Sequence, residues 1–183
     1  MASDIPFVTS KHIFRQRKSP RLQGYDYSQS GAYFITICTS KRAHLFGQVF
    51  NDDVVLTTAD EIAFTSWLDL SNHHQEIELD VFVIMPNHIY GIVIILDPDV
   101  SAGYADAISM KQQPKAGRLS VVIGSYKSAV TRKIHTLAGH SNQTVWQSRF
   151  HDHIIRDEHS LNILRQYVLS NPACWNEDMF FGG

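Results

Sequence analysis

Two apolar segments, 79–85 and 88–96, follow one another with only Pro86 and Asn87 between them. Both segments are short and rich in β-branched residues, and a Pro-Asn pair between such segments is typical of a tight turn. The pattern predicts two paired strands in the interior of the protein. The longest uninterrupted apolar run, 89–96, has eight residues and is too short to cross a bilayer. We therefore expect a water-soluble protein built around a sheet.

The rest of the chain alternates between strand-like and helix-like patterns. Strands are expected over 33–39 and 146–156, and apolar residues at helical spacing predict helices over 57–71, 119–134 and 157–171. Thr57 or Thr58 is expected to cap the first helix and Asp157 the last, which ends at Asn171 because Pro172 follows. The order β-α-β-β-α-β and a final helix predicts an α+β fold of the ferredoxin-like split βαβ type.

The length of 183 residues predicts a single domain. Residues 1–24 are polar and basic and are expected to form an arm, residues 25–176 the folded domain with a long loop at 97–117, and residues 177–183 a tail. The two cysteines, Cys38 and Cys174, are far apart in the sequence, which argues against a zinc site or a disulfide framework. The N-terminus lacks the pattern of a signal peptide, so we expect a cytoplasmic location.

The charged residues are segregated along the chain. Residues 5–25 contain five Lys or Arg and residues 107–151 contain seven, with no acid in either segment, and together they hold 12 of the 16 basic residues. Residues 51–109 contain 11 acids and no Lys or Arg. Two basic segments that meet on one surface suit the phosphate backbone of a nucleic acid. A solvated arm and an ordinary helix face are the alternative explanation.

Two side chains are candidates for chemistry. His88 opens a predicted strand and shares one face of it with Tyr90, so it is either hydrogen-bonded at the sheet edge or a metal ligand. Tyr167 lies one helical turn before Asn171, so a phenol and a carboxamide share one helix face. A tyrosine hydroxyl needs activation to act as a nucleophile, since its pKa is about 10. For both residues, a structural role in the core is the competing interpretation.

Six motifs occur in order: GYDYS at 24–28, GAYFITICT at 31–39, MPNHIYG at 85–91, KSAVT at 127–131, VWQSR at 145–149 and YVLSNP at 167–172. In this combination the chain resembles the REP-associated tyrosine transposases, which are single-tyrosine HUH transposases of bacterial insertion sequences. The resemblance covers roughly residues 21–175. It implies that residues 25–176 form a transposase-like HUH domain of a mobile element, which acts on single-stranded or hairpin DNA such as palindromic repeats.

The resemblance also implies a role for individual residues. His88 matches the first metal-binding histidine, Asn171 the polar residue that completes the metal site, and Tyr167 the nucleophile that forms a 5′-phosphotyrosine. The implied metal is Mg²⁺ or Mn²⁺. Tyr90 occupies the position of the second histidine and is a third candidate ligand, although a phenol must lose its proton to bind a divalent metal well. This departure from the family pattern leaves DNA binding expected and puts catalysis in question.

Basic residues would hold the phosphates that flank the cleaved bond. The expected DNA-binding residues are Arg15, Arg17, Lys18 and Arg21 in the arm, which would clasp a hairpin, and Arg118, Lys127, Arg132 and Lys133 on the second helix.

Three functions remain open on the sequence alone. The first is an active DNA transposase, a monomer or homodimer without membrane contact, with Tyr167 as nucleophile and Tyr126 as the next choice. The second is a DNA-binding relic of such an enzyme, silenced by Tyr90. The third is a ferredoxin-like RNA-binding domain with stacking aromatics on its sheet, which the core-like character of Val83 and of residues 92–95 argues against.

Overall fold

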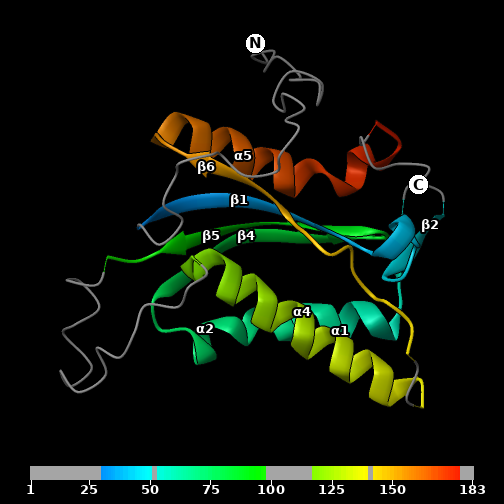
Figure 1. Ribbon diagram of the computed structural model, residues 1–183. Helices are drawn as coiled ribbons and strands as arrows, with labels where there is room; N and C mark the ends of the chain where they lie inside the picture. The colour runs from blue at the N-terminus through cyan, green and yellow to red at the C-terminus, as the bar shows by residue number, and fades with distance from the viewer. Residues whose placement is uncertain (1–29, 51–52, 98–116, 140–141, 178–183) are drawn as a thin grey trace, which may run out of the picture.

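The structure is a computed structural model, and it describes residues 30–50, 53–97, 117–139 and 142–177 (Figure 1). The expected basic arm, most of the loop at 97–117 and most of the expected tail lie outside these residues. So do four of the expected DNA-binding residues, namely Arg15, Arg17, Lys18 and Arg21.

A four-stranded antiparallel sheet forms the centre of the fold. Its strands are β1 (Gly31–Cys38), β4 (Ile77–Met85), β5 (His88–Ile95) and β6 (His151–Ile155), in the order β4-β5-β1-β6. β4 and β5 pair as predicted from the two apolar segments, across the turn at Pro86 and Asn87. Of the four predicted strands, the second (β4) and the third (β5) lie on one side of the first (β1), and the fourth (β6) lies on the other side. This is the expected ferredoxin-like order.

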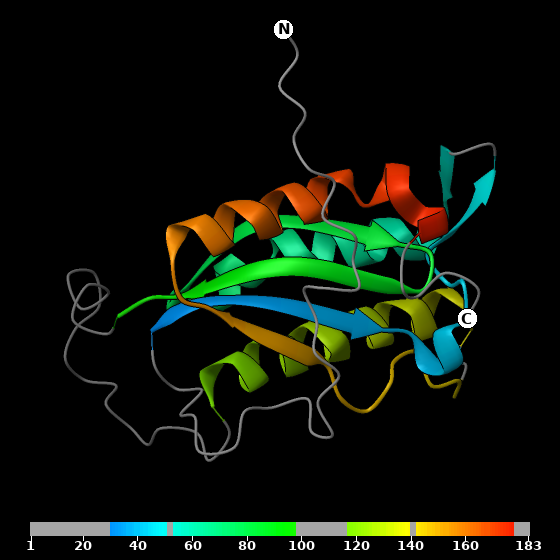
Figure 2. The same ribbon diagram turned by 90° about the horizontal axis from the view of Figure 1, so that it is seen from above.

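Helices cover both faces of the sheet. α1 (Thr58–Leu68), α2 (Leu70–His73) and α4 (Arg118–Leu137) lie on one face, and α5 (Glu158–Ser170) with the short helix η3 (Pro172–Glu177) lies on the other (Figures 1 and 2). The predicted α+β sandwich with an added C-terminal helix is confirmed. Because helices cover both faces, the sheet offers no open platform for stacking bases. None of the helices described is long and apolar enough to span a membrane.

Alternation along the central strands builds two separate cores. On β1, Tyr33, Ile35 and Ile37 face α1 and α4, whereas Phe34 and Cys38 face α5. β5 divides in the same way, with Ile89 in the first core and Tyr90 in the second. The α5 side therefore holds the smaller core, and it is the side on which the candidate residues lie.

The helix starts follow the predicted capping. The side chain of Thr57 accepts a hydrogen bond from the backbone N–H of Asp60, and that of Asp157 accepts one from the N–H of Ser160. The expected strand at 146–156 begins only at His151, because Trp146 turns its indole into the larger core, 5.3 Å from the ring of Phe46. The sequence indicates a basic turn at Lys41 and Arg42 after the first strand, and this segment forms the short helical turn η2 (Ser40–Arg42). The hairpin of β2 (Gly47–Phe50) and β3 (Asp53–Leu56) was not predicted.

Gly91 marks a close approach between the sheet and α1. A Cβ atom at this position would lie 2.5 Å from Cζ2 and 2.7 Å from Cη2 of Trp67, whose side chain is fully buried. Real side chains do not approach so closely, so the indole ring can come this near to β5 only where the strand carries glycine.

Asp60 is a buried acid in the first turn of α1, with 5% of its surface exposed. Burial, with a smaller contribution from the neighbouring charge of Glu61, raises the pKa of Asp60 to about 6. The folded chain therefore holds this proton more tightly than the unfolded chain, whose aspartates titrate near pH 4. It follows that this group lowers the stability of the fold as pH rises from about 4 to 6.

Replacing Asp60 with asparagine should remove that loss. Above pH 6 we expect Asp60→Asn to have the larger free energy of unfolding, by at most about 3 kcal/mol, with the difference vanishing near pH 4. Urea unfolding of both proteins at several pH values between 4 and 8 measures the difference directly. A difference that does not change with pH would mean that Asp60 titrates normally.

Candidate functional site

His88 is the first residue of β5 and is completely buried. Its Nδ1 atom lies 2.8 Å from Oδ1 of Asn87, the preceding residue in the turn. A carboxamide oxygen only accepts hydrogen bonds, so Nδ1 is the donor in this contact. The turn thus orients the imidazole of His88. β5 is a central strand, so the histidine lies inside the sheet rather than at its edge.

Aromatic rings enclose the imidazole of His88. Its ring centroid lies 4.3 Å from that of Tyr90 in an edge-on arrangement, and 5.9 Å from that of Trp175 in a stacked one. Trp175 belongs to η3, four residues after Asn171. This contact places the C-terminal end of α5 and the following helix η3 over the His88 end of β5, and Figure 2 shows the chain following this path.

Tyr90 points to the same side of β5 as His88, as the alternation predicts. Its ring stacks on Phe34 at 5.4 Å, and its hydroxyl accepts a hydrogen bond of 3.1 Å from the hydroxyl of Tyr167. Tyr90 is 1% exposed, whereas Tyr167 is only partly buried. The two phenols thus form a pair in which only the Tyr167 side is open to solvent.

Tyr167 is held in place by the way α5 packs on the sheet. Leu164 and Val168 are buried beneath the helix, and Tyr167 lies at the border of this apolar stripe. Asn171, one turn later, is the C-cap of α5 and is 3% exposed. In the middle of the helix, Arg165 bonds to Asp80 of β4 at 2.7 Å and ties α5 to the sheet.

The resemblance implies a divalent metal held by two imidazoles, and the residues can be tested against it. Within the described part of the chain, no group of three His, Cys, Asp or Glu side chains is arranged to hold a metal ion. The second imidazole is replaced by the phenol of Tyr90, which is already hydrogen-bonded to Tyr167. One imidazole and one carboxamide remain, from His88 and Asn171. This donor set does not fit the implied metal site, and we derive no step through a metal.

The expected DNA-binding residues of α4 lie on the far side of the sheet from Tyr167, and three of the four make internal hydrogen bonds. Arg118 donates to the backbone oxygen of Leu96, at the end of β5 remote from His88. Lys133 donates to Ser66 of α1 at 2.9 Å. Arg132 is exposed.

Lys127 differs from the other basic residues of α4 in its position. Its ammonium donates to the backbone oxygens of Gln147 at 2.6 Å and Ser148 at 3.3 Å, and burial lowers its pKa. Because the N–H of Gln147 bonds to the oxygen of Cys38, Lys127 lies near the end of the sheet that carries His88. These hydrogen bonds tie the loop at residues 147–148 to α4.

Tyr126, the second choice for a nucleophile, belongs to the other core. It is 1% exposed, and its hydroxyl donates to the backbone oxygen of Ala63 at 3.1 Å. Burial, with a smaller effect of the charge on Asp60, raises the pKa of Tyr126 well above its usual value. This phenol holds α4 to α1 and has no access to a substrate.

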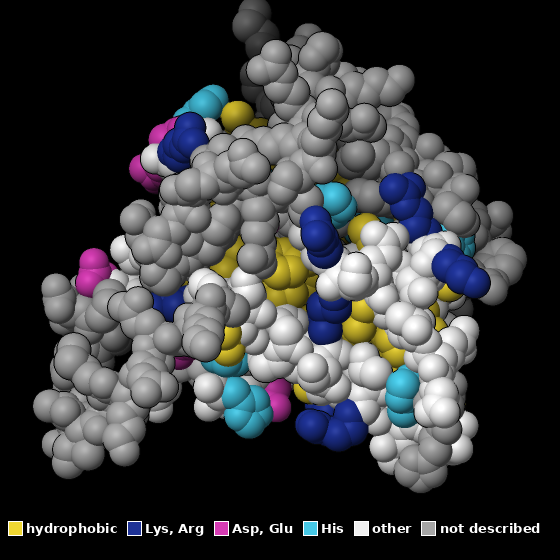
Figure 3. Space-filling model, in the orientation of Figure 1, with side chains coloured by type: hydrophobic (Ala, Val, Ile, Leu, Met, Phe, Trp, Pro, Cys, Tyr) yellow, Lys and Arg dark blue, Asp and Glu magenta, His cyan; other side chains and the backbone are white. Residues whose placement is uncertain are grey.

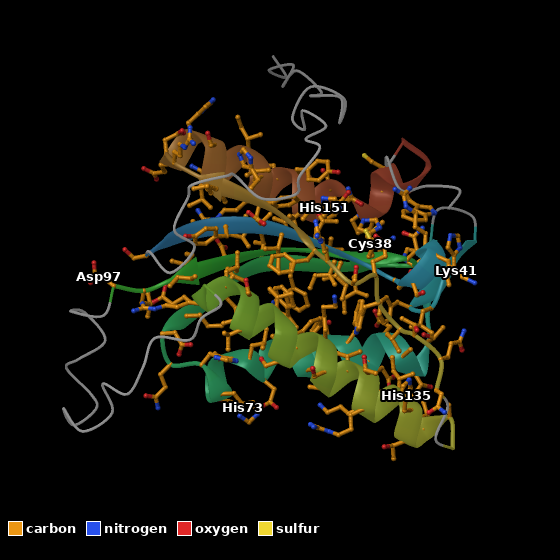
Figure 4. All side chains as sticks on the ribbon, viewed as in Figure 1. Cys38, Lys41, His73, Asp97, His135 and His151 are labelled. Atoms are coloured by element: carbon orange, nitrogen blue, oxygen red, sulfur yellow. The ribbon has the colours of Figure 1, made fainter. Side chains whose placement is uncertain are left out.

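Three residues near the candidate site were not predicted from the sequence. Cys38 pairs with His88 across β1 and β5, and His151 lies opposite Thr36, which in turn pairs with Tyr90. Figure 4 shows Cys38 and His151 at the same end of the sheet, on the strands beneath α5. Trp175 follows a proline and belongs to no periodic pattern. Only the strand register and the fold of η3 bring these three side chains to the site.

Comparisons with known proteins agree with this fold. An uncharacterized protein of Haemophilus influenzae is 32% identical over 168 residues, which are 90% of this chain and 93% of that protein. A solved REP-associated tyrosine transposase, bound to a REP hairpin, superposes with a TM-score of 0.53 at 17% identity, over 86% of this chain and 75% of the other. No protein-family model matches the sequence. The chain thus belongs to the same family as the Haemophilus influenzae protein and has the fold of a REP-associated tyrosine transposase.

Proposed function

We propose that the protein binds single-stranded or hairpin DNA and cleaves and rejoins it through Tyr167. The observation that carries the proposal is the pair of phenols at the His88 end of the sheet. Tyr167 lies on a helix and is only partly buried, and its hydroxyl is 3.1 Å from the Tyr90 hydroxyl. A tyrosine that served only the core would be fully buried, as Tyr126 is.

The proposed reaction is the transfer of a phosphodiester bond. The Tyr167 oxygen forms a bond to phosphorus, the bond from phosphorus to the 3′-oxygen breaks, and the 5′-phosphate remains on the protein. The phenolic proton passes to water, and the leaving 3′-oxygen takes up a proton to become a hydroxyl. The reverse reaction with another 3′-hydroxyl rejoins the DNA. The step is redox-neutral and needs no other reactant.

The residues around Tyr167 would position its hydroxyl. Tyr90 accepts a hydrogen bond from that hydroxyl and is itself fixed between the rings of His88 and Phe34. A nucleophile held in one orientation by a rigid helix and a buried partner needs only in-line approach of the phosphate. His88, Tyr90 and Phe34 thus serve as positioning residues in this proposal.

Two observations support DNA as the ligand: the similarity to a solved transposase and the distribution of basic residues. The solved transposase that shares this fold is bound to a REP hairpin. In this chain, 12 of the 16 basic residues fall in two segments without acids. The proposed step does not depend on the metal implied by the resemblance: among the described residues, Mg²⁺ or Mn²⁺ would find two ordinary donors at this site, His88 and Asn171, which do not make a full site.

Binding to DNA should depend steeply on salt. If about five phosphates are contacted, the logarithm of the affinity for a single strand should fall with a slope near −3.5 against the logarithm of the salt concentration. Fluorescence anisotropy with a labelled oligonucleotide at several salt concentrations measures this slope. An affinity that does not change with salt concentration would contradict the role of the basic segments in binding DNA.

The covalent step is tested with end-labelled hairpin DNA that has single-stranded flanks. Denaturing electrophoresis should reveal a protein–DNA adduct that a protease converts to a labelled peptide. Binding without any adduct, with or without Mn²⁺, would instead identify a DNA-binding protein that has lost its chemistry. Equal affinity for an unstructured RNA of the same length would contradict DNA as the ligand.

A further inference from the structure

The turn that follows β1 has an unusual backbone for its sequence. Lys41 has φ of 52° and Arg42 has φ of 53°, and they are the non-glycine residues with positive φ in the described part of the chain. The N–H of Ala43 bonds to the oxygen of Ser40 at 3.1 Å, so Lys41 and Arg42 are the two central residues of a tight turn with a left-handed backbone. Glycine, asparagine and aspartate normally fill these positions, because the left-handed conformation is unfavourable for other residues.

Several hydrogen bonds keep this turn in its strained conformation. The hydroxyl of Thr39 shares its single proton between the backbone oxygens of Ala43 at 2.8 Å and Asn87 at 3.0 Å. The N–H of Ser40 donates to the oxygen of Val145 at 2.8 Å. The turn is thus bonded to two other segments, so its strain is maintained by the surrounding structure. Strain of this kind is concentrated at ligand-binding and active sites.

The turn lies at the same end of the sheet as the proposed nucleophile. The N–H of Thr39 bonds to the oxygen of Asn87, whose side chain holds His88. Cys38 is the residue opposite His88 in the sheet. Lys41 comes three residues after Cys38, so the Cα atoms of Cys38 and Lys41 are at most about 11 Å apart. Figure 4 shows Lys41 at the same end of the sheet as Cys38 and His151.

The two central residues of the turn carry positive charges that a phosphate could bind. Lys41 is exposed and forms no ion pair with a described residue, and Arg42 is partly exposed. Most Lys and Arg side chains visible on the face shown in Figure 3 lie over its right half, while the visible acids lie toward the left edge and the lower centre. An ammonium beside a guanidinium matches a phosphate, which the guanidinium can bind through two parallel hydrogen bonds.

We propose that the turn at 40–43 is a phosphate-binding site that holds the DNA backbone beside the bond attacked by Tyr167. Lys41 and Arg42 are its ligands. The hydrogen bonds to two other segments fix the left-handed backbone, so both basic residues are held at one point of the structure. The inference rests on the proposed function, since it takes DNA as the substrate, and it adds the residues that hold the strand.

The site is tested by the salt dependence of DNA binding. The double variant Lys41→Gln and Arg42→Gln should bind a single-stranded oligonucleotide more weakly, with a salt slope less steep by about 0.7 for each phosphate that the variant no longer neutralises. Arg156→Gln is the matched control, because it removes an exposed basic residue that lies outside both basic segments and follows the end of β6 remote from His151. Its slope should equal that of the wild type.

The outcomes separate this inference from the proposed function. If the wild type binds DNA with a steep slope and the double variant has the same slope, only the turn site is wrong. If the wild type does not bind DNA, both the turn site and the proposed function are wrong.

Glycine variants distinguish a binding site from a turn that only shapes the fold. Lys41→Gly with Arg42→Gly removes both charges and also the backbone strain, so the thermal midpoint should rise by roughly 2–4 °C while DNA affinity falls. The glutamine variants keep the strain and should lose affinity without this rise. A stabilised glycine variant that binds DNA as well as the wild type would overturn the proposal.

Discussion

Replacing Tyr167 with phenylalanine is expected to abolish the covalent protein–DNA adduct and to leave DNA affinity within about twofold of the wild-type value. The substitution removes the attacking oxygen, and the neighbouring Tyr90 hydroxyl belongs to a side chain that is 1% exposed. The ring remains, so its contacts with Phe34 and Tyr90 persist and α5 keeps its packing. Adduct formation on a denaturing gel and anisotropy measurements at one salt concentration check the two parts of the prediction.

Tyr90→Phe is the matched control, since it removes the other hydroxyl of the hydrogen-bonded pair. It should still form the adduct, but more slowly, because Tyr167 loses the partner that orients it. An adduct in Tyr167→Phe that disappears in Tyr90→Phe would reverse the two roles. An adduct in both single variants would require a tyrosine outside this pair.

Replacing Tyr90 with histidine is expected to create the metal site that the present residues do not form. His88 and residue 90 point to the same side of β5, so the variant presents two imidazoles to one ion, with the Asn171 carboxamide as a third donor. Affinity for Mn²⁺ and the rate of DNA cleavage should rise by roughly 10–100-fold, the range by which changes around a metal alter its binding or activity.

Titration calorimetry with Mn²⁺ and cleavage assays at equal metal concentration measure both effects. Tyr90→Phe again serves as the control, because it removes the phenol without adding a ligand and should bind no more metal than the wild type. Should Tyr90→His lose stability and gain neither affinity nor activity, position 90 would be a packing position only. Equal cleavage by wild type and Tyr90→His would show that the second imidazole is dispensable.

The sequence predicted those parts of the fold that depend on local patterns. The apolar strands on either side of Pro86 and Asn87, the cap at Asp157 and the alternation that puts His88 beside Tyr90 all follow from spacing along one segment. The hairpin of β2 and β3 was missed, although Asn51 and Asp52 between short apolar stretches are a usual hairpin signal.

The candidate site was less predictable, because its members come from four separate segments. The bond between the hydroxyls of Tyr90 and Tyr167 joins residues 77 positions apart, and nothing local to either reveals it. A turn at Lys41 and Arg42 is expected at the end of the first strand, but its left-handed backbone could not be predicted, because residues of this type rarely adopt that conformation. The basic residues of α4 were predicted to bind DNA from their charge alone, and charge does not indicate which end of a helix lies near the candidate site.

The contact of Gly91 with Trp67 links two positions that are 24 residues apart in the chain. Any side chain at 91 would collide with the indole, so a change at 91 requires a smaller residue at 67 as well. Because Gly91 is adjacent to Tyr90, a collision there would also displace the strand that carries the candidate site. In an alignment of related chains these two positions should therefore vary together, and a histidine, a tyrosine or any other residue at 90 should be followed by glycine wherever tryptophan occupies 67.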